Sequence, residues 1–264
     1  MKNVAKLLIV AGSDPSGGAG IQADIKAATK NKVYAAAVIT SLTAQNTQGV
    51  EDVLDIDPLF LRRQIITVLK DIEFDAIKTG MLSNSKIINI VYEIFCKYCK
   101  NVPLIVDPVM VSTSGHRLLE EKAINILKKK LVKIAYITTP NIDEAEILSK
   151  TKINNIQDMK KAALIIKKIG SKNVLIKGGH MNIKDKIIHS LLLDENNNFH
   201  IISNKRINVG NIHGTGCSLA SAIASNIAKK NNILKSVKSA NSYIFRSAKN
   251  NIAVGCGSRV LRHF

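Results

Sequence analysis

The segment with the clearest chemical potential lies near residue 215. Gly214, Thr215, Gly216 and Cys217 lead into an alanine- and serine-rich run that is expected to be helical. Backbone N–H groups at a helix N-terminus are free to bind an anion, and glycines let a ligand approach them closely. The segment therefore predicts either an anion hole for a phosphoryl group in transfer or a plain helix cap with an inert thiol. In the first case the helix field would lower the pKa of Cys217 and make it a candidate base or polar contact.

Three further groups of residues could serve the same chemistry. The glycine-rich turn 17–20 precedes an expected helix, where it could approach an anionic ligand or simply reverse the chain. Asn141 and Glu144 are three residues apart at an expected helix start, so they could orient water around Mg²⁺ or merely cap the helix. Lys177 follows an apolar run, where it would suit a nucleotide phosphate or be one more lysine of a lysine-rich chain.

These residues lie at the ends of short apolar runs that alternate with longer amphipathic ones. We expect strands over 6–11, 33–42, 76–79, 104–106, 134–138 and 174–177, and a hairpin of 187–193 with 199–202. We expect helices over 19–31, 58–72, 86–99, 120–130, 141–148, 157–169, 217–229 and 233–250. This alternation predicts a parallel sheet covered by helices on both faces, with the ligand beyond the carboxyl ends of the strands. With neither an internal repeat nor a linker, residues 1–264 are expected to form a single domain.

Composition narrows the possible functions. The chain has 264 residues, 38 Lys and Arg against 20 Asp and Glu, and a formal net charge of +18. Such a charge suggests a nucleic-acid partner, yet only seven of the basic residues are Arg, aromatic residues are 4% and Trp is absent. An AT-rich genome would enrich Lys, Asn and Ile without selecting for an anionic partner, so we expect that the protein has no nucleic-acid partner. With 46% hydrophobic residues the chain can bury a full core, which excludes a disordered protein.

The chain also carries few signals for membranes or metals. We expect no membrane span, since no apolar run approaches about 18 residues, and Asp14 and Pro15 end the first apolar run too early for a signal peptide. A cytoplasmic protein is expected. Cys96 and Cys99 have the spacing of half a zinc site, but without a second pair they are expected to be core residues, and Cys256 is also expected to be inert.

Six segments, in collinear order over essentially the whole chain, resemble the hydroxymethylpyrimidine and phosphomethylpyrimidine kinases of the ribokinase-like superfamily. They are 11–24, 42–50, 78–82, 107–111 with 114–115, 140–144 and 213–217. The resemblance implies a ribokinase-like three-layer α/β/α sandwich with a mostly parallel central sheet. It also implies an enzyme of thiamine biosynthesis that uses ATP and Mg²⁺. This enzyme would phosphorylate 4-amino-5-hydroxymethyl-2-methylpyrimidine and then convert the monophosphate to the diphosphate. Relatives further suggest a homodimer.

The resemblance also assigns the residues that hold the pyrimidine. In the family these are a glycine, an aspartate, a glutamine, a methionine and a valine, which correspond here to Gly12, Asp24, Gln45, Met81 and Val109. A carboxamide and a carboxylate can pair with the amine and ring nitrogens of an aminopyrimidine, while Met and Val pack against its faces.

A second set of residues is implied for the phosphates. Asn141 and Glu144 would organise Mg²⁺ through water, and Lys177, Asn141 and Thr215 would bind the nucleotide. The N–H groups of 214–217 would hold the transferring group, with Lys177 compensating charge.

Cys217 and Ile212 lie at positions where members of the superfamily differ. Cys217 follows the pyrimidine kinases, whereas many sugar kinases of the superfamily have Asp there, and its role is either base or binding contact. Ile212 departs from the Thr that is frequent before the glycine motif, which could alter nucleotide packing.

Two alternatives remain. A pyridoxal or pyridoxine kinase of the same subfamily would bind a similar six-membered ring with a hydroxymethyl arm, although the setting of Gln45 favours the pyrimidine. The other is a nucleic-acid-binding protein on a retained kinase fold, motivated by the charge alone. Such a protein would be expected to lose its phosphate-site residues first, and here Asn141, Glu144, Lys177 and 214–217 are all present.

Overall fold

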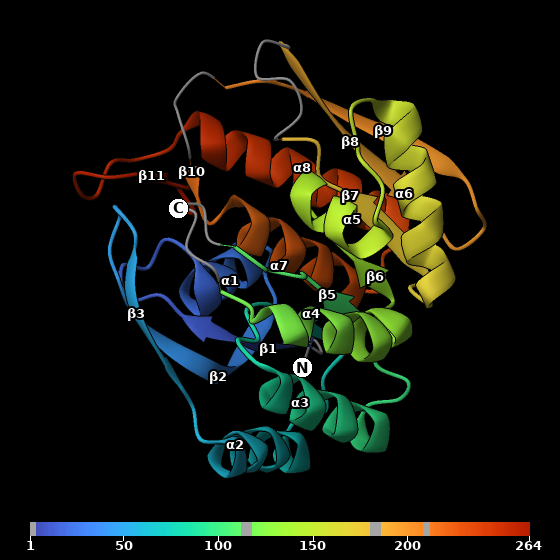
Figure 1. The fold of residues 1–264 in the computed structure, drawn as a ribbon. Helices are drawn as coiled ribbons and strands as arrows, with labels where there is room; N and C mark the ends of the chain where they lie inside the picture. Colours follow the sequence, from blue (N-terminus) through green and yellow to red (C-terminus); the bar gives the residue numbers. More distant parts are fainter. Residues whose placement is uncertain (1–3, 112–117, 180–185, 208–211) are drawn as a thin grey trace.

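The computed structural model describes residues 4–111, 118–179, 186–207 and 212–264 (Figure 1). Its centre is a nine-stranded sheet with the order β3-β2-β1-β4-β5-β6-β7-β8-β9. The strands are β1 (Lys6–Ser13), β2 (Tyr34–Gln45), β3 (Val50–Asp55), β4 (Ala76–Thr79), β5 (Leu104–Val106), β6 (Ile137–Thr138), β7 (Asn173–Ile176), β8 (Ile187–Leu193) and β9 (Phe199–Lys205). Strands β2, β1, β4, β5, β6 and β7 run parallel, while β3, β8 and β9 are antiparallel at the two edges. A separate pair joins β10 (Ile212–His213) to β11 (Arg259–Val260).

Helices cover both faces of this sheet (Figure 1). One face packs against α1 (Gly20–Lys30), α7 (Thr215–Ala228) and α8 (Ile233–Lys249). The other packs against α2 (Pro58–Asp71), α3 (Ser85–Tyr98), α4 (Glu121–Leu127), a π-helical turn (Lys128–Val132), α5 (Ile142–Ser149) and α6 (Ile156–Ile169). The expected three-layer α/β/α sandwich with a mostly parallel central sheet is therefore confirmed.

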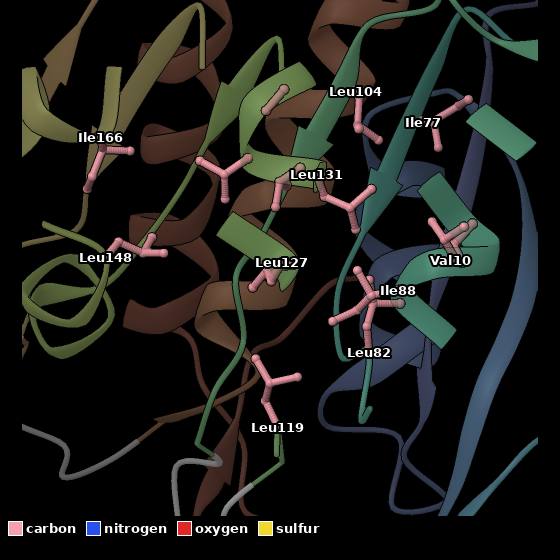
Figure 2. Close-up of a cluster of buried hydrophobic side chains, with 14 of the residues drawn as sticks. Val10, Ile77, Leu82, Ile88, Leu104, Leu119, Leu127, Leu131, Leu148 and Ile166 are labelled. Carbon is pink, nitrogen blue, oxygen red and sulfur yellow. The ribbon is translucent and has the colours of Figure 1, made fainter. Parts of the chain in front are cut away.

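The alternation of side chains along the strands explains the two cores. In β1, Leu7 and Ile9 belong to the core beneath α1, α7 and α8, whereas Leu8 and Val10 point into the opposite core. All four are fully buried, which requires helices on both faces. Figure 2 shows the second core, where Val10 lies with Ile88 and other branched side chains from the helices.

Most expected elements occur within a few residues of their predicted bounds, but β3, β10 and β11 were not predicted. The β3 sequence shows no alternation of apolar and polar residues, because most of its side chains are exposed at the edge of the sheet. The two-residue strands β10 and β11 are too short for any periodic pattern. Strand β2 continues three residues beyond its predicted end, which brings Gln45 into the sheet.

Two of the cysteine expectations concern α3. Cys99, just after the helix, is buried, and burial raises the pKa of its thiol to about 11, as expected of a core cysteine. Cys96 is half-buried and Cys256 is exposed, and all four cysteines of the chain are free thiols. Among the described residues, none of the helices combines the length and apolar character that a membrane span requires.

Candidate active site

The carboxyl ends of the parallel strands meet the N-terminus of α7 at one edge of the sheet. Lys177 directly follows β7, and its Nζ lies 3.3 Å from the position that a Cβ on Gly216 would occupy. Cys217 accepts a hydrogen bond from the N–H of Gly20, at the start of α1. Two motifs almost 200 residues apart in sequence thus form one site, at the place where an open α/β sheet binds its ligand.

A close contact between two glycines joins these motifs. Gly214 has a φ of 79°, in the left-handed region that favours glycine, and a Cβ there would lie 1.8 Å from the carbonyl oxygen of Gly18. A Cβ on Gly18 would in turn lie 2.7 Å from Cδ2 of His213. The glycines are therefore required by the packing of one loop on the other.

Lys177 lies in a network of buried oxygen atoms. Its Nζ is 2.9 Å from Oδ1 of Asp107, which also accepts a hydrogen bond from the Thr139 hydroxyl at 3.1 Å. Burial disfavours the ammonium, but the charges of Asp107 and Glu144 outweigh burial and raise the pKa of Lys177. A lysine that stays charged next to the first turn of α7 can balance the charge of a phosphate.

Asn141 and Glu144 form a capping box at the start of α5. The Asn141 side chain accepts a hydrogen bond from the Glu144 N–H, and the Glu144 carboxylate accepts one from the Asn141 N–H, both at 2.8 Å. The capping interpretation of this pair is confirmed. The cap also fixes the Glu144 carboxylate, which accepts a further hydrogen bond from the Met110 backbone.

Glu144 has an unusual acidity because it is buried. Burial raises its pKa to about 7, opposed by Lys177 and reinforced by the charge of Asp107. Asp107 and Glu144 therefore offer two hard carboxylate ligands that share one lysine. Mg²⁺ in kinases is typically held by one or two carboxylates together with substrate phosphates, so this donor set fits the ion.

The structure corrects the expectation for Cys217. The helix field was expected to lower the pKa of this thiol, but burial raises it to about 11, with Lys78 acting in the opposite direction. Desolvation thus outweighs the helix field, and Cys217 is a neutral thiol near neutral pH. Its place beside Gly20 supports a contact role and argues against a general base.

The residues expected to hold the pyrimidine lie on the neighbouring strands. A Cβ on Gly12, in β1, would lie 3.0 Å from Sδ of Met81, so these two residues are in contact. Val109 is half-buried in the loop after β5, and Gln45 lies at the end of β2, where its Nε2 is 2.8 Å from Nε2 of His213. Ser114 and Gly115 of the fourth matching segment lie outside the described residues.

Comparisons with known proteins agree on one family. Residues 14–262 match the sequence pattern of phosphomethylpyrimidine kinase. The hydroxymethylpyrimidine/phosphomethylpyrimidine kinase of Bacillus subtilis is 40% identical over 262 residues, which cover 99% of this chain and 96% of that protein. The chain belongs to the phosphomethylpyrimidine kinase family.

Solved structures support the same assignment. A phosphomethylpyrimidine kinase from Clostridium difficile matches with a TM-score of 0.81 and 40% identity, covering 94% of this chain and all of that one. A pyridoxal kinase from Staphylococcus aureus in complex with ADP matches with a TM-score of 0.90 and 32% identity. The match covers 99% of this chain and 94% of that one. The chain spans about half the length of the first curated relatives, which include bifunctional thiamine-biosynthesis enzymes.

In this phosphomethylpyrimidine kinase fold, the Asp24 carboxylate binds two side chains of the protein itself. The carboxylate is fully buried and accepts hydrogen bonds from Lys78 Nζ and the Ser221 hydroxyl, both at 2.7 Å. Because both oxygens are occupied within the protein, a contact between Asp24 and a substrate stays a prediction. The observed contacts support a role in holding Lys78 beneath α7.

Lys78, Asp107, Asp14 and His213 are further candidate site residues, to which sequence reasoning assigned no role. Lys78 is fully buried, and although burial opposes its charge, the carboxylates of Asp24 and Asp107 raise its pKa. Lys78 and Asp107 stand at strand ends inside matching segments, and that position was the available signal. The roles of Asp14 and His213 depend on partners far away in sequence, which no local pattern reveals.

The contact at Gly214 gives a first prediction. Gly214→Ala should lower the free energy of unfolding by at least about 2 kcal/mol and reduce kcat/KM by about 100-fold or more, because the methyl group would collide with the Gly18 carbonyl. Thermal unfolding and ATP turnover measure both effects. Gly179→Ala is the matched control, since a Cβ at that exposed glycine meets no atom of the described residues within 4 Å. Wild-type stability in Gly214→Ala would contradict the contact.

The acidity of Glu144 gives a second prediction. If its carboxylate serves the phosphate site, kcat/KM should fall about tenfold between about pH 8 and about pH 6, with an inflection near 7 that moves lower at saturating Mg²⁺. Glu144→Gln should lose activity and this inflection. A raised carboxyl pKa means that the folded state binds the extra proton, so stability should also fall as the pH rises from about 4.5 to about 7 in the wild type.

Glu146→Gln is the control for this experiment, since Glu146 lies on the same helix but pairs with Lys152 at the surface. It should keep the wild-type pH profile. An unchanged inflection in Glu144→Gln would show that another group titrates.

Proposed function

We propose that this chain phosphorylates 4-amino-5-hydroxymethyl-2-methylpyrimidine with ATP and then converts the monophosphate to the diphosphate, for thiamine biosynthesis. The observation that carries the proposal is the arrangement around α7. The first turn of this helix lies beside Lys177, which can meet nucleotide phosphates, and His213 just before the helix lies beside Gln45. Gln45, together with the contacting pair of Gly12 and Met81, can meet a small ring. The names of the relatives support the substrate, and the ADP complex of the pyridoxal kinase supports the nucleotide.

The proposed reaction relies on charge compensation more than on proton abstraction. The N–H groups of 214–217 and the Lys177 ammonium would stabilise the transferring phosphoryl group, with Thr215 and Asn141 close to the nucleotide. Mg²⁺, held through Glu144 and Asp107, would neutralise further phosphate charge. A loose phosphoryl transfer needs little help from a base, which agrees with a neutral Cys217 thiol.

The pyrimidine would lie between apolar contacts and one amide. Met81, packed against Gly12, and Val109 would cover the faces of the ring, and Gln45 would bond its polar edge. Asp24 would act indirectly, by holding Lys78 in position through the hydrogen bond between them.

The second candidate is phosphorylation of pyridoxal or pyridoxine. A pyridoxal kinase from Staphylococcus aureus in complex with AMP-PCP and pyridoxal has a TM-score of 0.89 to this chain, at 31% identity. The pyrimidine is favoured because relatives named for it reach 40% identity over nearly full length.

Other properties follow from this proposal. We infer one kinase domain over residues 1–264, since the sheet and both cores extend through the described chain. We infer a cytoplasmic enzyme, because its four cysteines are free thiols. The exposed pair of Leu42 and Leu54, on neighbouring strands at the β3 edge, supports the expected homodimer.

A coupled kinase assay tests the main proposal. With the purified chain, ATP and Mg²⁺, we expect kcat/KM for the hydroxymethylpyrimidine to exceed that for pyridoxal by about tenfold or more, and the monophosphate to be a second substrate. Removal of Mg²⁺ with a chelator should abolish turnover. Ready turnover of pyridoxal with an inert pyrimidine would establish the second candidate instead.

A further prediction concerns Cys217. Because its thiol is neutral, Cys217→Ser should keep kcat within about tenfold of the wild type, and alkylation of this thiol should be slow below about pH 9. Kinetics and mass spectrometry of iodoacetamide-treated protein measure both. A loss of about 1000-fold in kcat, with the fold intact, would restore Cys217 as a base.

A further inference from the structure

His213 contacts two side chains through a single nitrogen atom. It lies in β10, directly before the glycines of the anion hole, and is 9% exposed. Its Nε2 lies 2.8 Å from Nε2 of Gln45 and 3.2 Å from Oδ2 of Asp14. One atom thus connects the first loop, the end of β2 and the start of the phosphate loop.

The two contacts need opposite proton arrangements. The Gln45 amide nitrogen can only donate, so a hydrogen bond from it requires a bare lone pair on Nε2 of His213. A carboxylate can only accept, so the contact with Asp14 requires a proton on the same atom. Asp14 stays an ionised carboxylate that can only accept, because hydrogen bonds from His213, Ser16 and Ala19 outweigh the effect of burial and lower its pKa. When Nε2 carries the proton, the Gln45 amide must turn so that its oxygen faces the ring.

The other end of the amide permits this reversal. The Thr43 hydroxyl lies 3.1 Å from Oε1 of Gln45 and 2.9 Å from the carbonyl oxygen of Ser13. It can donate its one proton to the amide oxygen, or donate to Ser13 and accept from a reversed amide. Both directions of the amide are therefore satisfied, and the proton on His213 selects between them.

The direction of this amide matters for a ligand. An aminopyrimidine presents a donor amine beside an acceptor ring nitrogen, whereas the corresponding pyrimidin-4-one presents an acceptor beside a donor. With its hydroxymethyl group directed to the phosphate loop, each ring would match only one direction of Gln45. We propose that His213 is a specificity-determining residue that selects aminopyrimidines by fixing the direction of the Gln45 amide. This inference rests on the proposed function, which places Gln45 at the ring edge.

Calorimetric titration without nucleotide tests the inference, with the aminopyrimidine and its pyrimidin-4-one counterpart as ligands. The wild type should prefer the aminopyrimidine by about 100-fold. His213→Leu frees the amide and should reduce this ratio by about tenfold or more, whereas Thr43→Val, which removes a partner that fits both directions of the amide, should weaken the binding of both rings alike. His200→Leu is the matched control, because His200 forms a similar 2.8 Å contact with Asp194 in the β8–β9 hairpin, and should keep the wild-type ratio.

The wild-type protein supplies a readout that needs no variant. The ¹⁵N chemical shift of His213 Nε2 should be measured with the protein saturated by each ligand in turn. It should indicate a protonated nitrogen with one of the two pyrimidines and an unprotonated nitrogen with the other. The same signal with both rings, or an unchanged preference in a folded His213→Leu protein, would overturn the inference alone. A wild type that binds neither pyrimidine would overturn the proposed function and, with it, this inference.

Discussion

Charge balance in a dry environment is the constraint on which the site depends. Lys78 and Lys177 lie beneath and beside the first turn of α7, with fully and largely buried side chains. An unpaired ammonium in such a place would cost several kcal/mol, so each is paired with a carboxylate, Asp24 for Lys78 and Asp107 for Lys177. Glu144 is the third carboxylate, and burial raises its pKa although Lys177, which it shares with Asp107, acts in the opposite direction. An arriving phosphate and cation would therefore enter a site whose charges are already fixed in position.

This constraint also explains the behaviour of Cys217. A helix N-terminus lowers the pKa of a thiol only when the thiolate keeps some solvation. Here Cys217 is half-buried, partial burial removes much of the water around its thiol, and the nearby carboxylates Asp24 and Asp107 disfavour a further negative charge. A residue type that suggests nucleophilic or base chemistry in the sequence thus becomes a small packing and binding group in the fold.

The sequence predicted the layers of the fold because periodicity is a local property. The continuous apolar runs of β1, β4 and β5 can be read without knowing their partners. Edge strand β3 could not be read in this way, since its side chains are mostly exposed. At the site, the sequence located the glycine motif and Lys177 from their positions at element ends. It could not locate the relation of Asp14 to His213, because that contact joins residues 199 apart.

The contact between Gly18 and Gly214 has a consequence for how ligands bind. Since no side chain separates the two loops, neither can shift far without the other, and they behave as one rigid unit. One loop faces the proposed pyrimidine and the other faces the proposed phosphate. A ligand that orders one loop also orders the other, so the second ligand pays a smaller entropy cost when it binds. The two substrates should therefore strengthen each other's binding even without touching.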